Sequence, residues 1–326
     1  MSTTQTLDPY LRLLSERGGS DLFFTVGAPP QVKIEGELRP IGQDKLKPGD
    51  VKGMIYPLLS PERIERFERD LELNLAMSLE GRGRYRVNVF IQRGEVSLVI
   101  RHIKEKIPSF EDLRLPLTLR DLVMEKHGLI LVVGATGSGK SSTLAAMLDY
   151  RIKNMTGHVL TIEDPMEFAF SHNKSIVNQR EVGVDTHTYA NALKEAMREA
   201  PDVIMIGEVR DKETMNHAIA FADTGHLCVT TLHSTNSHQA LDRILRFFAP
   251  EARDQLLMDI SLTLVAIVSQ RLVMGVDGRR LPANEILMNS GYISDLIRRG
   301  RVDEIPEVMA KGGVAGMQTF DQALFD

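Results

Sequence analysis

The sequence predicts an α/β protein of two parts, a smaller α+β domain followed by a domain built on a mostly parallel sheet. The chain has 326 residues, enough for two domains, with 43% hydrophobic and 25% charged residues, as in ordinary globular proteins. Its first third alternates short strand-like runs with turns. From Leu119 on, apolar strand-like runs alternate with longer helical ones, which is typical of a parallel sheet with helices on both faces.

The first domain is expected at residues 1–103. A leucine-rich helix over 7–14 is stopped by Gly18 and Gly19. Alternating apolar and polar residues then predict strands, interrupted by one charge-rich helix. We expect the strands at 21–26, 31–38, 73–79, 84–92 and 96–103, and the helix at 60–71. Residues 104–118 contain two prolines and no sustained period, so they form the predicted linker.

The second domain is expected at 119–290. Its predicted strands are 129–133, 158–162, 175–179, 203–206 and 227–232. Its predicted helices are 143–150, 189–199, 214–222 and 240–248. After Pro250 we expect mainly helix, with a short strand pair near 271–273 and 281–286. The helical C-terminal region, 291–326, stops inside a helix-like run, and we expect it to be incomplete.

Composition limits the classes of function. The net charge of −5 gives no sign of a surface that coats nucleic acid. No apolar run approaches the roughly 20 residues that span a bilayer, and the N-terminus lacks the apolar region of a signal peptide. The single cysteine, Cys228, excludes an intrachain disulfide and lies in an apolar run typical of a buried thiol. We expect a cytoplasmic protein, in which any contact with the membrane would be through partners.

The residues after the apolar run 129–133 read GATGSGKS and match the phosphate-binding pattern GxxxxGK[ST]. Glycines let backbone N–H groups surround a phosphate chain, and the helix that follows adds a favourable dipole. Lys140 can reach the β- and γ-phosphates, and the Ser141 hydroxyl can bind Mg²⁺. A chance glycine-rich turn would not have strand, motif and helix in this order, so we expect a nucleoside triphosphate site. The predicted binding residues are Gly134, Ala135, Thr136, Gly137, Ser138, Gly139, Lys140, Ser141 and Ser142.

Two acidic residues follow predicted strands, where ligands bind in open α/β sheets. Glu208 follows the apolar strand 203–206 and a glycine, as a Walker B acid does, so we expect it near the metal. Glu163 follows strand 158–162. Taken alone, it is as well explained by a solvated carboxylate as by a catalytic one.

Histidines and arginines complete the candidate set. His226 and His233 stand at the two ends of strand 227–232, and the pattern fits a structural role as well as a functional one. A zinc site is not favoured, because no third ligand has suitable spacing. Guanidinium groups from a neighbouring subunit often bind a triphosphate. The candidates are Arg82, Arg84, Arg86, Arg93 and Arg101, and the pattern alone does not choose among them.

Together these blocks resemble the type IV pilus retraction ATPases, the PilT/PilU family of secretion-type ATPases, over nearly the whole chain. The matching blocks are the Walker A segment 134–150, the Asp box 161–168, the signature 177–183, the Walker B segment 206–211 and the His box 224–233. The opening of the first domain, Gly19-Ser20-Asp21-Leu22, resembles the family's PAS-like domain, and the second domain resembles its RecA-like domain.

The resemblance implies ATP and Mg²⁺ as cofactors and a homo-hexameric ring that binds no nucleic acid and does not insert into the membrane. It implies that Glu163 activates water, that Glu208 lies near Mg²⁺, and that His226 and His233 belong to the active site. It favours Arg84, Arg86 and Arg101 as arginine fingers and makes 104–118 a hinge. It also implies an inner-membrane platform protein as partner, at the base of the pilus.

Within this family the runs 21–27, 215–222 and 256–259 resemble the PilU branch. The PilT branch carries an AIRNLI-type motif near its C-terminus, and here the matching residues, 292–298, read YISDLIR. This departure favours an accessory motor that works with a PilT-type ATPase.

Three alternatives remain. The first is an assembly ATPase of pilus extension or type II secretion. Such ATPases carry a zinc motif of four cysteines and a longer N-terminal region, whereas this chain has one cysteine. A nucleic-acid translocase would need a basic channel with stacking aromatics, but aromatic residues are only 6%. A scaffold that binds nucleotide without hydrolysis would not need both Glu163 and Glu208.

Overall fold

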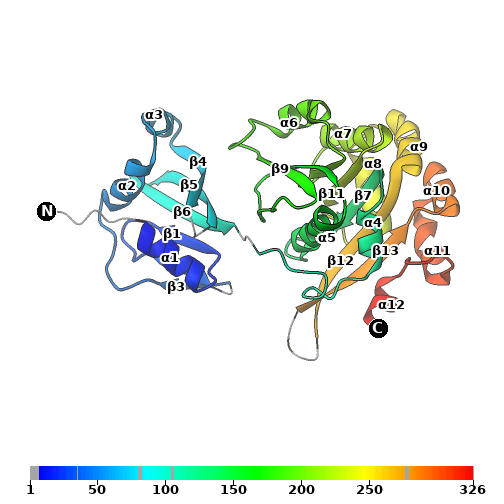
Figure 1. The fold of residues 1–326 in the computed structure, drawn as a ribbon, viewed down its shortest axis with the longest axis horizontal. Coiled ribbons are helices and arrows are strands. Elements are labelled where there is room, and N and C mark those ends of the chain that lie inside the picture. The colour runs from blue at the N-terminus through cyan, green and yellow to red at the C-terminus, as the bar shows by residue number, and fades with distance from the viewer. Residues whose placement is uncertain are drawn as a thin grey trace. The chain divides into compact units, whose positions relative to one another are not determined.

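The computed structural model describes residues 7–325 except Glu35, 80–82, 104–105, 276–277 and Arg279. The chain divides into two compact units (Figure 1). The first comprises Met1–Lys106 with Glu167–Ala169, and the second comprises Ile107–Met166 with Phe170–Asp326.

The first unit is a six-stranded antiparallel sheet in the order β3-β2-β1-β6-β5-β4, with its helices packed on one face. Burial alternates along β5, where Tyr85, Val87 and Val89 are buried and the residues between them are half-buried. Leu11, Leu14 and Phe67 from the helices fill the core against them. The strands are β1 Asp21–Phe24, β2 Gln31–Ile34, β3 Glu37–Pro40, β4 Glu72–Leu79, β5 Gly83–Gln92 and β6 Glu95–Ile103. The helices are α1 Asp8–Glu16, α2 Asp50–Ile55, the 3₁₀ turn η1 Tyr56–Leu58 and α3 Pro61–Asp70.

One expectation for this unit was wrong, and one helix was not predicted. The strand expected at 31–38 is a hairpin of β2 and β3, because the chain turns at Gly36 with φ 87°. Helix α2 was not predicted, since its six residues are too few for a period to stand out. Helix α3 agrees with the prediction and begins after Ser60, whose hydroxyl accepts a hydrogen bond from the Arg63 N–H.

The second unit is a seven-stranded sheet in the order β13-β12-β7-β11-β10-β8-β9, parallel except for the edge strand β13. This confirms the predicted α/β class with a mostly parallel sheet. The strands are β7 Gly128–Val133, β8 Gly157–Glu163, β9 Ser175–Glu181, β10 Val203–Ile206, β11 Leu227–Leu232, β12 Leu264–Met274 and β13 Arg280–Met288. The helices are α4 Thr118–Val123, α5 Lys140–Asn154, α6 Tyr189–Ala196, α7 Lys212–Asp223, α8 Ser237–Arg246, α9 Arg253–Thr263, α10 Gly291–Arg298, α11 Ile305–Lys311 and α12 Phe320–Phe325.

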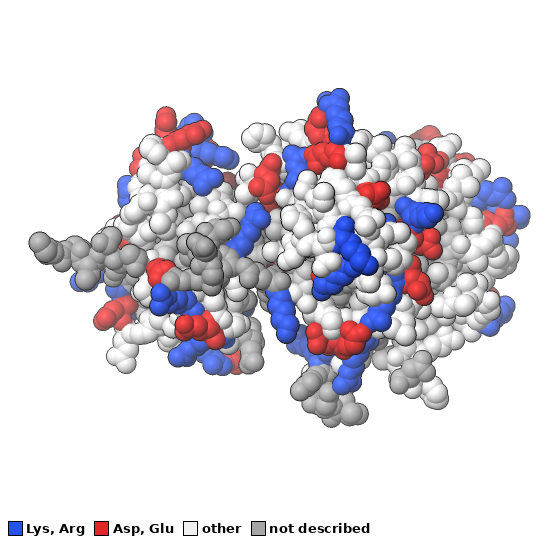
Figure 2. Space-filling model, viewed as in Figure 1, with Lys and Arg blue, Asp and Glu red and all other residues white. Residues whose placement is uncertain are grey.

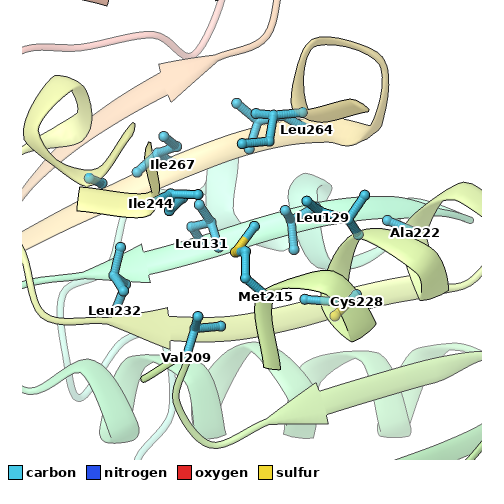
Figure 3. Close-up of a cluster of buried hydrophobic side chains, with 14 of the residues drawn as sticks. Leu129, Leu131, Val209, Met215, Ala222, Cys228, Leu232, Ile244, Leu264 and Ile267 are labelled. Atoms are coloured by element: carbon cyan, nitrogen blue, oxygen red, sulfur yellow. The ribbon is translucent and has the colours of Figure 1, made fainter. Parts of the chain in front are cut away.

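Helices cover both faces of this sheet, so its strands β7, β10 and β11 are buried along their whole length. Leu129, Leu131 and Val133 of β7 pack with α6 to α11, whereas Ile130 and Val132 pack with α4 and α5. Figure 3 shows part of the first cluster, in which Met215 and Ile244 lie against the β7 side chains. Cys228 is fully buried there, and burial raises the pKa of its thiol.

The strands after Pro250 are longer than predicted. β12 and β13 pair over nine residues on each strand, from Ala266–Met288 to Met274–Arg280. The prediction failed because β12 is buried beside β7, and a continuous apolar run does not distinguish a buried strand from a buried helix.

The predicted domain limits stay predictions, but part of the expected linker has a packed structure. Phe110 and Leu115 are buried in the core of the second unit with α4 and α5. The Phe110 ring meets Tyr150 edge-on at 5.6 Å, and the Arg120 guanidinium lies over its face.

Surface charge is mixed. Basic and acidic side chains are interspersed on the face in Figure 2. Ion pairs also form between neighbouring turns of helical segments, such as Lys153–Asp149 at 2.6 Å and Arg198–Glu195 at 2.8 Å. Among the helices described, none is long and apolar enough to cross a membrane.

We predict that Phe110→Ala lowers the free energy of unfolding of the second unit by about 3–5 kcal/mol, because it empties a buried aromatic site. Chemical denaturation of the full chain measures this. Leu117→Ala is the matched control, since that side chain is 66% exposed whereas Phe110 is 4% exposed. Equal stability of the two variants would show that 107–118 is a linker without a packing role.

Candidate nucleotide site

The predicted site residues of the second unit gather at one edge of its sheet. The loop 134–141 follows β7, Glu163 ends β8, Glu208 follows β10 and His233 follows β11. These four strands are parallel neighbours in the order β7-β11-β10-β8, so their carboxyl ends share one edge. That edge is where open α/β sheets bind ligands.

The phosphate loop is folded tightly around its lysine. The Lys140 ammonium is buried and donates hydrogen bonds to the carbonyl oxygens of Gly134 and Ala135, each at 2.9 Å. Gly139, with φ 87°, turns the chain into α5, and the first turn of that helix carries no acidic residue. A side chain at Gly134 would place its Cβ 2.4 Å from Ser138 Oγ and 2.6 Å from the Gln270 carbonyl, so only glycine fits. A lysine charge and the N-terminus of a 15-residue helix therefore stand together.

A buried amide supports the loop from the neighbouring strand. Gln270 of β12 donates from Nε2 to the Ser138 carbonyl at 2.7 Å. Its Oε1 accepts from the Thr143 hydroxyl of α5 at 2.7 Å and from Asn284 Nδ2 of β13 at 3.0 Å. Gln270 is 2% exposed. It thus ties the loop, the helix and the strand pair together, and it fixes the position of the Ser138 carbonyl.

Glu163 is buried and held by neutral donors. Its Oε1 accepts hydrogen bonds from the Thr161 hydroxyl at 2.7 Å and from Gln179 Nε2 at 3.2 Å. Thr161 and Gln179 are register partners on β8 and β9, so both side chains point to the same face. Gln179 Oε1 accepts from the Phe170 N–H at 2.8 Å, which fixes the amide with its NH₂ toward Glu163. The carboxylate therefore has a defined orientation.

Glu208 has a different environment, with basic partners. Its side chain is 19% exposed and contacts Arg210 Nε, and Oε2 lies 3.0 Å from His233 Nε2. Arg210 also donates from Nη1 to Asp164 at 3.2 Å. Burial alone would raise the pKa of Glu208, but the hydrogen bond and charge of Arg210, with the contribution of His233, outweigh it and lower the pKa. Glu208 is thus held as an anion.

The backbone around Glu208 is fixed on both sides. The Gly207 N–H donates to the Ile162 carbonyl at 2.8 Å, and the Thr231 hydroxyl donates to the Gly207 carbonyl at 2.7 Å. These bonds hold the residue before Glu208 between the ends of β8 and β11.

His226 does not lie at this edge. It precedes β11, so the six-residue strand, about 20 Å long, separates it from His233. Its Nδ1 lies 3.1 Å from both the Phe221 carbonyl and the Thr224 hydroxyl at the end of α7. The expectation that both histidines share one site is therefore wrong within a single chain, because parallel strands place their two ends on opposite edges.

The predicted trans arginines lie in the first unit. Arg84 and Arg86 are on β5, and Arg86 pairs in register with Arg101 on β6. Arg101 Nε donates to Asp21 Oδ1 at 2.7 Å. Arg93 occupies the turn between β5 and β6 with φ 54°, and Arg82 falls outside the described residues. Their role in a neighbouring site stays a prediction.

Several residues at this edge were not found from the sequence. Strand register brings three of them to their partners: Gln270, Gln179 and Thr161. A single sequence does not reveal this register. Arg210 carried a signal, since it follows Glu208 by two residues and its positive charge complements a strand-end carboxylate.

Comparison with known proteins agrees with this geometry. The family described as Type II/IV secretion system protein matches residues 65–289. The type IV pilus ATPase PilU of Pseudomonas aeruginosa is 49% identical over 97% of this chain and 83% of its own length. PilT of the same organism, named a type IV pilus retraction ATPase, is 38% identical over 96% and 91%. A crystal structure of the pilus retraction motor PilT with bound ADP superposes with a TM-score of 0.89, at 40% identity, covering 97% of this chain and 91% of that one.

We predict that Gln270→Met weakens ATP binding about tenfold, because three buried groups lose their shared partner and the loop loses its support. Titration with a fluorescent ATP analogue, at a temperature where the variant is fully folded, measures the affinity. Gln255→Met is the control, since that amide is exposed and donates to Asp259 along α9. Unchanged affinity in Gln270→Met would show that the loop keeps its shape without the amide.

Proposed function

This chain belongs to the type II/IV secretion system protein family, and we propose that it is an ATP-hydrolysing motor of type IV pilus retraction and twitching motility. The observation that carries the proposal is the shared edge at which the phosphate loop, Glu163 and Glu208 meet. The higher identity to PilU than to PilT, 49% against 38%, favours the role of an accessory motor that works with a PilT-type ATPase.

Binding comes first in the proposed mechanism. Backbone N–H groups of 134–141 and the N-terminus of α5 surround the β- and γ-phosphates. The Lys140 ammonium exchanges its carbonyl partners, Gly134 and Ala135, for phosphate oxygens. The charged oxygens of the nucleotide are stronger acceptors for an ammonium than neutral carbonyls.

The residues fit Mg²⁺. Ser141 and Glu208 offer a hydroxyl and an ionised carboxylate, the oxygen ligands that this metal prefers. Within the described part of the chain, no group of three or more His, Cys, Asp or Glu could hold a metal by itself. That agrees with an ion that takes its remaining ligands from phosphates and water. When bound, Mg²⁺ neutralises charge on the β- and γ-phosphates.

Hydrolysis depends on Glu163. A water molecule beside the γ-phosphate donates a hydrogen bond to this carboxylate and attacks phosphorus in line with the bridging oxygen of ADP. The new P–O bond forms as the bond to ADP breaks, and the water's proton passes to Glu163. Thr161 and Gln179 hold the carboxylate during this step.

We infer a homo-hexamer at the cytoplasmic side of the inner membrane, where hydrolysis turns one unit of each chain against the other and moves a platform protein. Arg84, Arg86 and Arg101 of a neighbouring chain would bind the γ-phosphate, because the guanidinium fork matches its oxygens.

We predict that Glu163→Gln retains ATP binding while kcat falls on the order of 10²–10³-fold, because the amide does not accept the water's proton. Steady-state turnover with a binding titration tests both parts. Lys140→Ala is the companion variant, and we expect it to lose nucleotide affinity itself. Normal turnover in Glu163→Gln would remove the assignment of this residue.

We predict that turnover per chain rises steeply with protein concentration, as a site completed across an interface requires. Arg84→Ala or Arg86→Ala should be inactive alone, with the exposed Arg39→Ala as the control. Mixing an arginine variant with an equal amount of Glu163→Gln should restore activity, because about a quarter of the interfaces in a mixed ring combine both native groups. No recovery on mixing, with flat concentration dependence, would place the arginines outside the site.

A further inference from the structure

The Tyr189 hydroxyl is buried without a hydrogen-bond partner among the described residues. Tyr189 is the first residue of α6, directly after Thr188, whose hydroxyl accepts from the Asn191 N–H at 3.1 Å. The start of the helix therefore fixes where the ring stands. A buried hydroxyl normally finds a partner, so an unpartnered one needs an explanation.

The position of this hydroxyl is defined by Gly207. A Cβ atom built on Gly207 would lie 2.8 Å from the Tyr189 oxygen, 3.3 Å from the Ile162 carbonyl and 3.4 Å from the Glu163 Cα. Gly207 directly precedes Glu208, and Glu163 ends β8. The phenol oxygen thus lies where the adjacent strands β8 and β10 end, close to the backbone of Glu163 and of Gly207, the residue before Glu208.

The charges around Tyr189 keep it protonated. Burial raises the pKa of its phenol, and the negative charges of Asp164, Glu208 and Glu163 raise it further, against the opposing effect of Arg210. A neutral phenol has one O–H to donate and an oxygen that accepts. The phenol oxygen can therefore accept a hydrogen bond from a water molecule, as a carboxylate oxygen can.

We propose that Tyr189 binds the attacking water together with Glu163, an inference that rests on the proposed ATP hydrolysis. One hydrogen of the water is donated to Glu163 and the other to the phenol oxygen. Both O–H bonds are then fixed, and a lone pair of the water faces the γ-phosphorus. The partner missing from the hydroxyl is thus a water that becomes ordered when the triphosphate binds.

Tyr189→Phe removes the oxygen and keeps the ring. We expect kcat to fall roughly tenfold while KM for ATP changes by less than about twofold, because the water is held for the reaction and not for binding. We expect the affinity for ADP with aluminium fluoride, which mimics the reacting phosphate and retains the attacking water, to fall by the same factor as kcat. Affinity for ADP and for a non-hydrolysable ATP analogue should stay unchanged.

A merely structural tyrosine would give another pattern. The Phe variant should unfold at the same or a higher denaturant concentration, since it removes an unpartnered polar atom from a buried place. Tyr292→Phe is the matched control, because that ring is exposed. A second test uses Gly207→Ala, which should cost less activity in the Tyr189→Phe background, where the colliding oxygen is gone.

The outcomes separate this inference from the function on which it rests. Full kcat in Tyr189→Phe, or an equal loss of affinity for the non-hydrolysable analogue, overturns the water-binding role. In that case the wild-type protein still binds ADP with aluminium fluoride and Glu163→Gln is still inactive. If the wild-type protein binds no nucleotide, or Glu163→Gln turns over normally, the proposed function itself fails.

Discussion

The parallel pairing of β7, β11, β10 and β8 is the constraint on which the site depends. Parallel strands place all their carboxyl ends on one edge, so four segments distant in sequence deliver the phosphate loop, Glu163, Glu208 and His233 to one place. Parallel neighbours need long crossover connections, which are usually helices that run over a face of the sheet. In such sheets helices cover both faces. The two apolar clusters on either side of β7 therefore stabilise the arrangement that brings these groups together.

The two carboxylates at this edge have different hydrogen-bond partners, and this difference supports the separate roles that we propose for them. Glu163 is buried and accepts hydrogen bonds from the Thr161 hydroxyl and the Gln179 amide. Glu208 contacts Arg210 and His233, which lower its pKa and hold it ionised. A carboxylate that accepts a proton and one that stays an anion need such different environments. The geometry thus favours Glu163 for the water and Glu208 for the metal.

Most of the fold could be predicted from local sequence patterns. The loop 134–141, the apolar strand 203–206 and the order of strands and helices are written within short windows of sequence, and the structure confirms the parallel sheet. Side-chain contacts that depend on the pairing of distant strands were not predicted. The sequence does not show that Gln179 stands opposite Thr161 or that Gln270 reaches Ser138, since register appears only when strands meet. His226 shows another limit: the family resemblance assigned it to the active site, but it precedes β11 whereas His233 follows this strand.

The strand pair that was underestimated gives the phosphate loop its support. Gln270 lies opposite Asn284 in the β12–β13 ladder, and Asn284 accepts from Gln318 Nε2 at its backbone carbonyl, at 2.7 Å. Hydrogen bonds therefore run without a break from the segment before α12 through β13 and β12 to the Ser138 carbonyl. A phosphate loop can bind charge only if its amides are held in position before the ligand arrives. In this protein, part of that positioning comes from the edge strand β13, which is far from the loop in sequence.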